Sequence, residues 1–509
     1  MEGNNNKKGF LHPDHPKPIT RRQFLAQGFL DGAGFLMMPT VLDMLLRAQA
    51  AKADCGVLGA TAGCDMLKVI ILDLAGGPQS LIEPVTRYGN LISAASYRIR
   101  GEPNMPSFST DAQGQYTFGV PIKTNHHALK AIQAVAGVRG TGNPYGVNDP
   151  KILTNTLGAT ICTNALDDTH TNKLSPANFL AQIICGQYFT TVLGTGTTSR
   201  HYPNASYYES FLGGYTEGPI FNAGNRSIHV ANTTALLKSF GYGPAFDSLS
   251  SQQIQAILNG IKDLNSARAR ALTTMHGVRE LEEAYNCAIS ARLSLGQTDL
   301  SQFDPRNDPN LQLIFGIGPN NAPTDLSVRT AFIVNTVLKC WAPVGVITVG
   351  GCDYHYGWRA DSDAHDYNRI GLLIGRTLAL ASRLLKPVLI VCLMDGSVSS
   401  AYNSPHWTSD AFYNGSQAMF YFHPGRRPAY ARASSPLRAQ LGWYTDHPTQ
   451  SRIDPNTFVG NSPERCCYSI ILNYLYLNNP RTFVDEFRRY VPETLVPRSE
   501  IDGLLLFNP

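Results

Sequence analysis

The fold of this chain is decided by the stretch Leu67-Lys68-Val69-Ile70-Ile71-Leu72-Asp73-Leu74, which is followed by Ala75-Gly76-Gly77-Pro78. The run is apolar almost throughout, is rich in β-branched residues, and ends at residues that break regular structure. A continuous apolar run bounded in this way predicts a strand that is buried on both faces of a sheet. Strands of that kind are typical of parallel sheets.

The same pattern returns later in the chain, where it alternates with helical periodicity. The sequence predicts strands at Pro343–Gly350 and Pro387–Met394, and helices at Leu326–Lys339 and His365–Leu385. Further helices are expected at 175–185 and across 250–293, whereas residues 85–155 are expected to be irregular. Alternating helices and buried strands indicate an α/β fold with a mostly parallel sheet covered by helices on both faces. We expect one large three-layer domain.

The composition narrows the class of protein. The chain has 42 basic and 38 acidic residues, and 43% of its residues are hydrophobic. A nearly neutral balance excludes the electrostatic footprint of a nucleic-acid binder, so no nucleic acid is expected as a partner. The hydrophobic share is sufficient for a packed core and excludes bulk disorder.

The N-terminus predicts export. Arg21-Arg22 precedes Phe24-Leu25 and a moderately apolar run, as in twin-arginine signal peptides. Three residues unsuited to a bilayer interrupt that run: Asp31, Pro39 and Asp43. We therefore divide the chain into a signal peptide at 1–50 and a domain at 51–509, with no membrane span in the mature protein. The alternative is a basic patch before an ordinary amphipathic helix.

This signal implies the twin-arginine translocase as the partner during export. The mature protein is then expected in the periplasm or outside the cell. Removal of the signal peptide takes away six basic and four acidic residues, which leaves the mature chain nearly neutral.

Residues able to carry chemistry follow the predicted strands. Asp73 ends the first strand, Asp353 and His355 follow the second, and Asp395 follows the third. Ligands of open parallel sheets bind at the carboxyl ends of the strands. Carboxylate and imidazole ligands suit Zn²⁺ or Mn²⁺, so these four residues are the predicted metal ligands. The alternative role for an aspartate at a strand end is to cap a turn.

Ser80 is the candidate nucleophile. It follows Gly76-Gly77-Pro78-Gln79 and is expected near a helix N-terminus, where backbone N–H groups favour an anion.

The order of these motifs resembles the DUF1501 family of exported bacterial proteins, which is grouped with the alkaline phosphatase/sulfatase superfamily. The segment Gly350-Gly351-Cys352-Asp353-Tyr354-His355 is similar to the family's Gly-Gly-Trp-Asp-Thr-His motif. The resemblance implies an alkaline-phosphatase-like fold and a metal site that includes Asp353 and His355. The chain departs from the family where Gln79 takes the place of a serine, and where Asp395-Gly396 replaces a longer Thr-Asp-Phe-Gly-Arg pattern.

Two functions follow from these observations. The first is an exported, metal-dependent hydrolase of phosphate or sulfate esters, whose partner is a small anionic ester. The second is a noncatalytic envelope protein that keeps the same fold as a scaffold or for binding an envelope partner. The departures from the family motifs favour the second function, and the ligand types at the strand ends favour the first.

Overall fold

The structure is a computed structural model. It describes residues 66–509 apart from 75–76, 103–104, 138–146, 164–192, 196–227, 235–236, 238–249, 251, 258, 261–262, 264–266, 268–299, 340–341, 343, 395–396, 401–403, 408, 412–414, 449 and 461.

An eight-stranded sheet forms the centre of the described chain, in the order β11-β2-β9-β6-β1-β5-β3-β4. Its strands are β1 (Lys68–Leu74), β2 (Thr156–Ile161), β3 (Leu193–Gly194), β4 (Ile228–His229), β5 (Val344–Val349), β6 (Val388–Met394), β9 (Gln417–Phe422) and β11 (Gln440–Leu441). Two small antiparallel pairs lie apart from it: β7 (Ser397–Ser399) with β8 (Ser409–Ala411), and β10 (Ala429–Tyr430) with β12 (Phe507–Asn508).

The sheet is mostly parallel, as predicted. β1 lies between β5 and β6 and is parallel to both. β9 is antiparallel to β2 and β6, and within the described sheet it alone runs against the others. The strands predicted around Ile70, Val346 and Val391 are confirmed, with ends that differ by a single residue.

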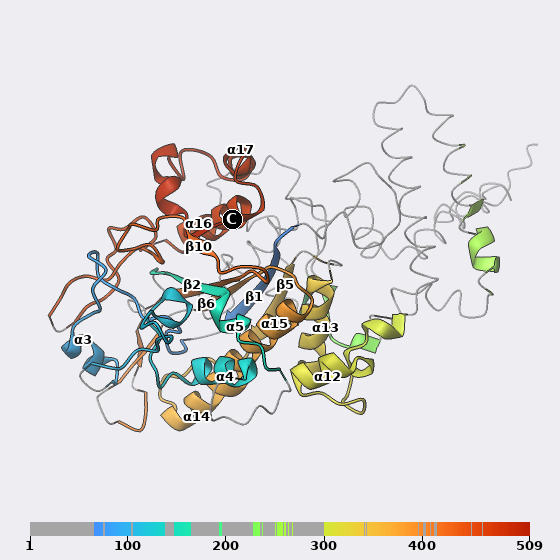
Figure 1. Ribbon diagram of the computed structural model, residues 1–509, viewed down its shortest axis with the longest axis horizontal. Coiled ribbons are helices and arrows are strands. Elements are labelled where there is room, and N and C mark those ends of the chain that lie inside the picture. The colour runs from blue at the N-terminus through green and yellow to red at the C-terminus, as the bar shows by residue number, and fades with distance from the viewer. Residues whose placement is uncertain are drawn as a thin grey trace, which may run out of the picture.

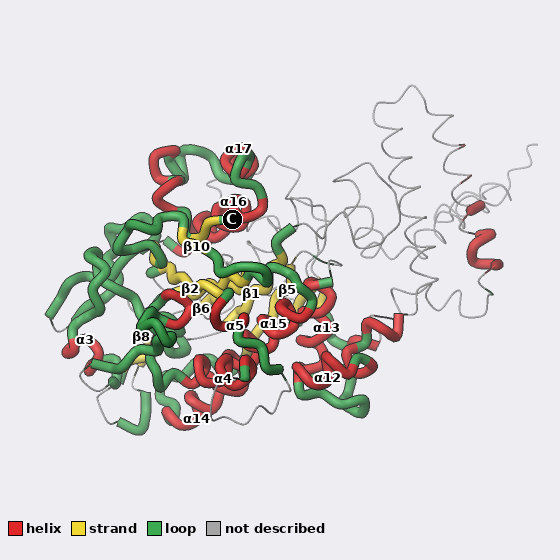
Figure 2. The backbone as a smooth tube through the Cα atoms, viewed as in Figure 1, coloured by secondary structure: helices red, strands yellow, loops and turns green. Residues whose placement is uncertain are grey.

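Helices cover both faces of the sheet (Figures 1 and 2). On one side lie α4 (His127–Ala136), α5 (Lys151–Thr154), α13 (Leu326–Leu338) and α15 (Leu372–Arg383), and on the other lie α16 (Pro463–Asn478) and α17 (Phe483–Arg488). The described part of the chain also contains the α-helices α3 (Ala94–Ile99), α12 (Pro309–Phe315) and α14 (Arg359–His365). Short 3-10 turns lie at 117–119, 300–303, 305–307, 498–500 and 502–504.

The two faces hold separate cores, which explains why the strands are apolar throughout. In β1, Ile70 and Leu72 join the core under α4, α13 and α15, whereas Val69 and Ile71 join the core under α16 and α17. Successive side chains of a strand point to opposite faces, so a strand covered on both sides requires an unbroken apolar run. The described residues therefore form an α/β fold with three layers.

Two expectations about secondary structure are wrong. Residues 85–155 are not irregular, because α3, α4 and α5 lie within them. α4 is built from alanine-rich sequence between the cap residues His126 and Gly137, and the latter adopts a left-handed φ of 79°. The predicted helix at His365–Leu385 begins earlier, at Arg359, and contains a π-helical turn at Asp366–Gly371 before α15.

Some expectations fall outside the described residues. These are the signal peptide at 1–50, the helix at 175–185 and most of the helix at 250–293. Within 250–293, the described residues 252–257 and 259–260 are helical, as predicted. None of the described helices has the length and apolar character that a membrane crossing requires.

Candidate active site at the carboxyl edge of the sheet

The three predicted strand ends meet at one edge of the sheet. Leu74 of β1 is in register with Val349 of β5 and with Met394 of β6. Because these strands are parallel, the segments that follow them begin side by side. The prediction that these strand ends share one edge is confirmed.

Ser80 lies at this edge, in the segment that follows β1, and contacts the segment that follows β6. Its side chain is buried, and its Oγ accepts a hydrogen bond from Arg100 Nη2 at 3.1 Å. Ser80 Oγ also lies 3.4 Å from Ser397 Oγ, at the start of β7. Two distant parts of the chain therefore bring two hydroxyls and one guanidinium together.

Arg100 belongs to a buried cluster of four charges. Its Nη1 lies 3.2 Å from Glu83 Oε2, and Lys123 Nζ lies 3.5 Å from Glu83 Oε1 and 2.6 Å from Glu102 Oε1. All four side chains are less than 10% exposed. Two cations and two carboxylates cancel, so the cluster is neutral overall, as burial of charges requires.

The carboxylates keep both cations charged. Burial is the largest single influence and acts to lower the pKa of Lys123 and of Arg100. The charges around them, with those of Glu83 and Glu102 among them, together outweigh burial, so both pKa values are raised. Arg100 and Lys123 therefore remain positive beside the Ser80 hydroxyl.

The space within the cluster is small. A cavity of about 10 Å³ lies against Ser80, Glu83, Arg100 and Lys123, with the Trp407 ring on its wall. That volume is near the lower limit for a single water molecule.

Asp353 and His355 lie together in the segment after β5. Asp353 Oδ1 contacts His355 Nδ1, and these side chains are 52% and 30% exposed. Cys352, which precedes Asp353, is buried, and so is Tyr354, which lies between Asp353 and His355. Residues i and i+2 of this segment therefore share a side, as their spacing predicts.

Asp73 and Asp395 do not complete a metal site within the described chain. Asp73 Oδ2 accepts a hydrogen bond of 3.3 Å from Thr348 Oγ1 on the neighbouring strand. Asp395 lies outside the described residues. Among the residues that are described, no three histidine, cysteine, aspartate or glutamate side chains form a group able to hold a metal ion. The structure thus joins Asp353 to His355, and the four-ligand set stays a prediction.

Sequence reasoning missed the charge cluster. Glu83, Arg100, Glu102 and Lys123 are spread over 41 positions, and the last three lie in the stretch 85–155 that was expected to be irregular. No spacing rule connects them, because loops and the short helix α3 bring them together. The sequence feature that could have indicated the cluster is that these residues follow Ser80 closely in the chain and precede a helix that begins at His127.

Two histidines border the cluster. His126 is buried, and its Nδ1 accepts the backbone N–H of Ala128 at the start of α4. His127 Nε2 lies 3.6 Å from Asp363 Oδ2, while Gln79 Nε2 donates to Asp363 Oδ1 at 3.1 Å. Asp363 lies on α14.

Comparison with known proteins places this chain in no family: no family model matches it, nor does any curated protein or solved structure. The class that the structure supports is a three-layer α/β protein with a mostly parallel sheet and polar residues at its carboxyl edge.

Proposed function

We propose that this chain is an exported hydrolase of phosphate or sulfate esters, with an alkaline-phosphatase-like fold and a dependence on a divalent metal. The observation that supports it is the contact of 3.1 Å between Ser80 Oγ and Arg100 Nη2 at the carboxyl edge, with Lys123 in the same cluster. A hydroxyl beside two buried cations suits attack on an anionic ester, because the cations stabilise the negative charge that develops.

The reaction would proceed in two steps. Ser80 Oγ forms a bond to phosphorus or sulfur, and the ester oxygen leaves as an alcohol with the proton that Ser80 gives up. Water then hydrolyses the seryl ester, which releases phosphate or sulfate and restores the hydroxyl. The Arg100 guanidinium favours the ionised form of Ser80, because it donates a hydrogen bond to that oxygen.

The metal would be held by Asp353 and His355, with Asp395 and Asp73 as the further ligands. The donor types suit Zn²⁺ or Mn²⁺, and the described pair supplies two of the three protein ligands that a catalytic zinc takes. When bound, such an ion supplies Lewis-acid polarisation of the ester.

A second function has an observation in its favour. The charges of the four-residue cluster cancel, all four side chains are buried, and the cavity has room for about one water molecule. A buried ion cluster whose charges cancel is what a noncatalytic scaffold or binding protein would keep for structural reasons.

Turnover and metal content separate the two functions. We expect the mature protein, purified without chelator, to contain stoichiometric zinc or manganese and to release nitrophenol from p-nitrophenyl phosphate or sulfate. Ser80→Ala should reduce turnover by on the order of a thousandfold or more, because it removes the nucleophile. Ser434→Ala, at an exposed serine, is the control and should leave turnover unchanged. Absence of both metal and turnover would establish the scaffold function instead.

A further inference from the structure

A chain of hydrogen bonds connects the turn after β5 to the helix that follows it. His365 Nε2 lies 2.8 Å from the Gly350 carbonyl oxygen, and His365 Nδ1 lies 2.9 Å from the Tyr354 hydroxyl. The same hydroxyl lies 2.6 Å from Asp366 Oδ1. Tyr354 and Asp366 are buried, at 4% and 0% exposure.

The number of protons in this chain follows from its donors and acceptors. The Gly350 carbonyl only accepts, so His365 Nε2 carries a hydrogen. If Asp366 is ionised, Tyr354 donates to it, and His365 Nδ1 needs a second hydrogen to donate to Tyr354. If His365 is neutral, Tyr354 donates to Nδ1, and the Asp366 carboxyl needs the hydrogen to donate to Tyr354.

Both arrangements contain one proton more than a neutral imidazole with an ionised carboxylate. Without that proton, the Tyr354 hydroxyl has a single hydrogen for two acceptors, so one of its two contacts is no longer a hydrogen bond. Such a contact would leave a buried polar group unsatisfied.

We infer that Tyr354, His365 and Asp366 form a proton-holding latch that positions the turn carrying Asp353 and His355. Tyr354 stands between these two residues and points inward, so anchoring it fixes the side to which both neighbours point. That this turn carries metal ligands rests on the proposed function, whereas the hydrogen bonds among Tyr354, His365 and Asp366 do not depend on it. Tyr354, His365 and Asp366 are positioning residues.

The local backbone supports this arrangement. Gly351 adopts a φ of 83°, and a Cβ at this position would lie 3.2 Å from His365 Nε2. Glycine therefore permits both the turn and the approach of the imidazole to Gly350. Asp366 begins the π-helical turn, a distortion that is frequent at functional sites.

The surroundings favour a proton on Asp366. Burial raises the pKa of Asp366 to about 7, and burial lowers the pKa of His365. The proton therefore rests on the carboxyl and is lost as the pH rises through about 7. Other charged or titratable groups act on the latch: Lys123, Cys352, Asp363 and Arg369. His127 lies 3.6 Å from Asp363.

Hydrogen–deuterium exchange of the peptide around 350–358 tests the latch. The Gly357 amide, which donates to the Tyr354 carbonyl at 2.9 Å, reports directly on the turn. After correction for intrinsic exchange, we expect exchange in the wild type to be roughly five- to tenfold faster at pH 8.5 than at pH 5.5, the effect of one buried hydrogen bond.

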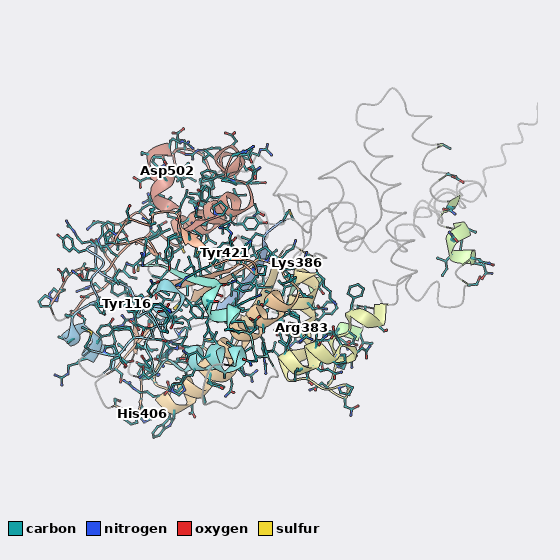
Figure 3. All side chains as sticks on the ribbon, in the orientation of Figure 1. Tyr116, Arg383, Lys386, His406, Tyr421 and Asp502 are labelled. Atoms are coloured by element: carbon teal, nitrogen blue, oxygen red, sulfur yellow. The ribbon has the colours of Figure 1, made fainter. Side chains whose placement is uncertain are left out.

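Two variants separate the proton from the packing. Asp366→Asn should give slow exchange at both pH values, because an amide donates to Tyr354 and cannot ionise. Tyr354→Phe removes both contacts and should give fast exchange at both. Asp502→Asn, at an exposed carboxylate on the side of the molecule away from His406 (Figure 3), should behave as the wild type. Thermal melting checks that each variant folds.

Wild-type exchange that does not depend on pH would overturn the latch. So would an Asp366→Asn variant with the pH dependence of the wild type, or a Tyr354→Phe variant with wild-type exchange. These measurements involve neither metal nor turnover, so a failure of the proposed hydrolase leaves their outcome unchanged.

Discussion

His126 meets two requirements at one position. Its Nδ1 accepts the Ala128 backbone N–H at 3.2 Å, which caps the first turn of α4, and its ring is 3% exposed. Burial, together with the nearby charge of Lys123, lowers the pKa of His126 to about 3. An imidazolium would lose the acceptor at Nδ1, so the neutral ring is the form that caps the helix.

This lowered pKa predicts how stability depends on pH. The unfolded chain takes up a proton at His126 below pH ~6.5, and the folded chain does so only near pH 3. The contribution of His126 to the free energy of unfolding is therefore complete above pH ~6.5, and falls by about 1.4 kcal/mol per pH unit as the pH drops toward 3.

Urea unfolding between pH 6.5 and 4.5 measures the effect. His126→Asn keeps an oxygen acceptor for the cap but does not titrate. We therefore expect its free energy of unfolding to fall less steeply as the pH drops, and the difference in slope should correspond to the uptake of about one proton. His447→Asn is the control, because the exposed His447 also accepts a backbone N–H, from Gln450. Equal slopes in the wild type and His126→Asn would show that the lowered pKa is wrong.

At the scale of elements, the π-helical turn and α15 approach α4 very closely. A Cβ on Gly371 would fall inside van der Waals distance of the Ala128 carbonyl oxygen, and one on Gly375 would lie 3.0 Å from Val135 Cβ. The two helices therefore pack backbone against backbone along a stripe of small residues. This contact secures α4, and with it the cap residue His126, beside the charge cluster.

Gly371→Ala tests that contact. Alanine favours a helix over glycine by about 1 kcal/mol, yet we expect the variant to lose roughly 1–3 kcal/mol of stability, because the backbone of α4 must move. Gly503→Ala, where nothing lies within 4 Å of the added Cβ, should change stability by less than about 1 kcal/mol. Denaturant midpoints measure both. A Gly371→Ala variant as stable as the wild type would contradict the close packing.

At the scale of the whole molecule, the central prediction concerns export. Replacing Arg21 and Arg22 by lysine keeps the charge of the signal, but we expect the precursor to remain in the cytoplasm, because guanidinium and ammonium groups are not interchangeable in recognition. Fractionation and immunoblotting measure it. Lys7→Arg with Lys8→Arg, outside the motif, is the control and should be exported normally. Normal export of the double-lysine form would contradict the signal assignment.

The elements that could be predicted are those with strong periodicity. β1, β5, β6 and α13 differ from the sequence expectation by a residue or so at each end, because a strand buried on both faces must be apolar at every position. α4 was missed, since its cap is a histidine and its helix is short. The π-helical turn was missed because the periodicity of 365–385 continues through it.

The candidate site could be predicted only where it follows directly from strand ends. The pairing of Asp353 with His355 follows from alternation along the chain, and the position of Ser80 at the carboxyl edge follows from parallel strands. The partners of Ser80 could not be predicted. Arg100 lies 20 residues away and Ser397 lies 317 residues away, and no spacing rule connects either of them to Ser80.

By itself, then, the sequence determined the α/β fold class, the three central strands β1, β5 and β6, and the edge at which the polar residues meet, because hydrophobic periodicity is a local property of the chain. Only the tertiary structure decided which charges are buried together. Glu83, Arg100, Glu102 and Lys123 can leave water only as a group whose charges cancel. Likewise, Asp366 reaches Tyr354 only when the helix packs on the turn. Neutralisation of charge and sharing of a proton depend on distances between residues remote in the chain, which local pattern does not contain.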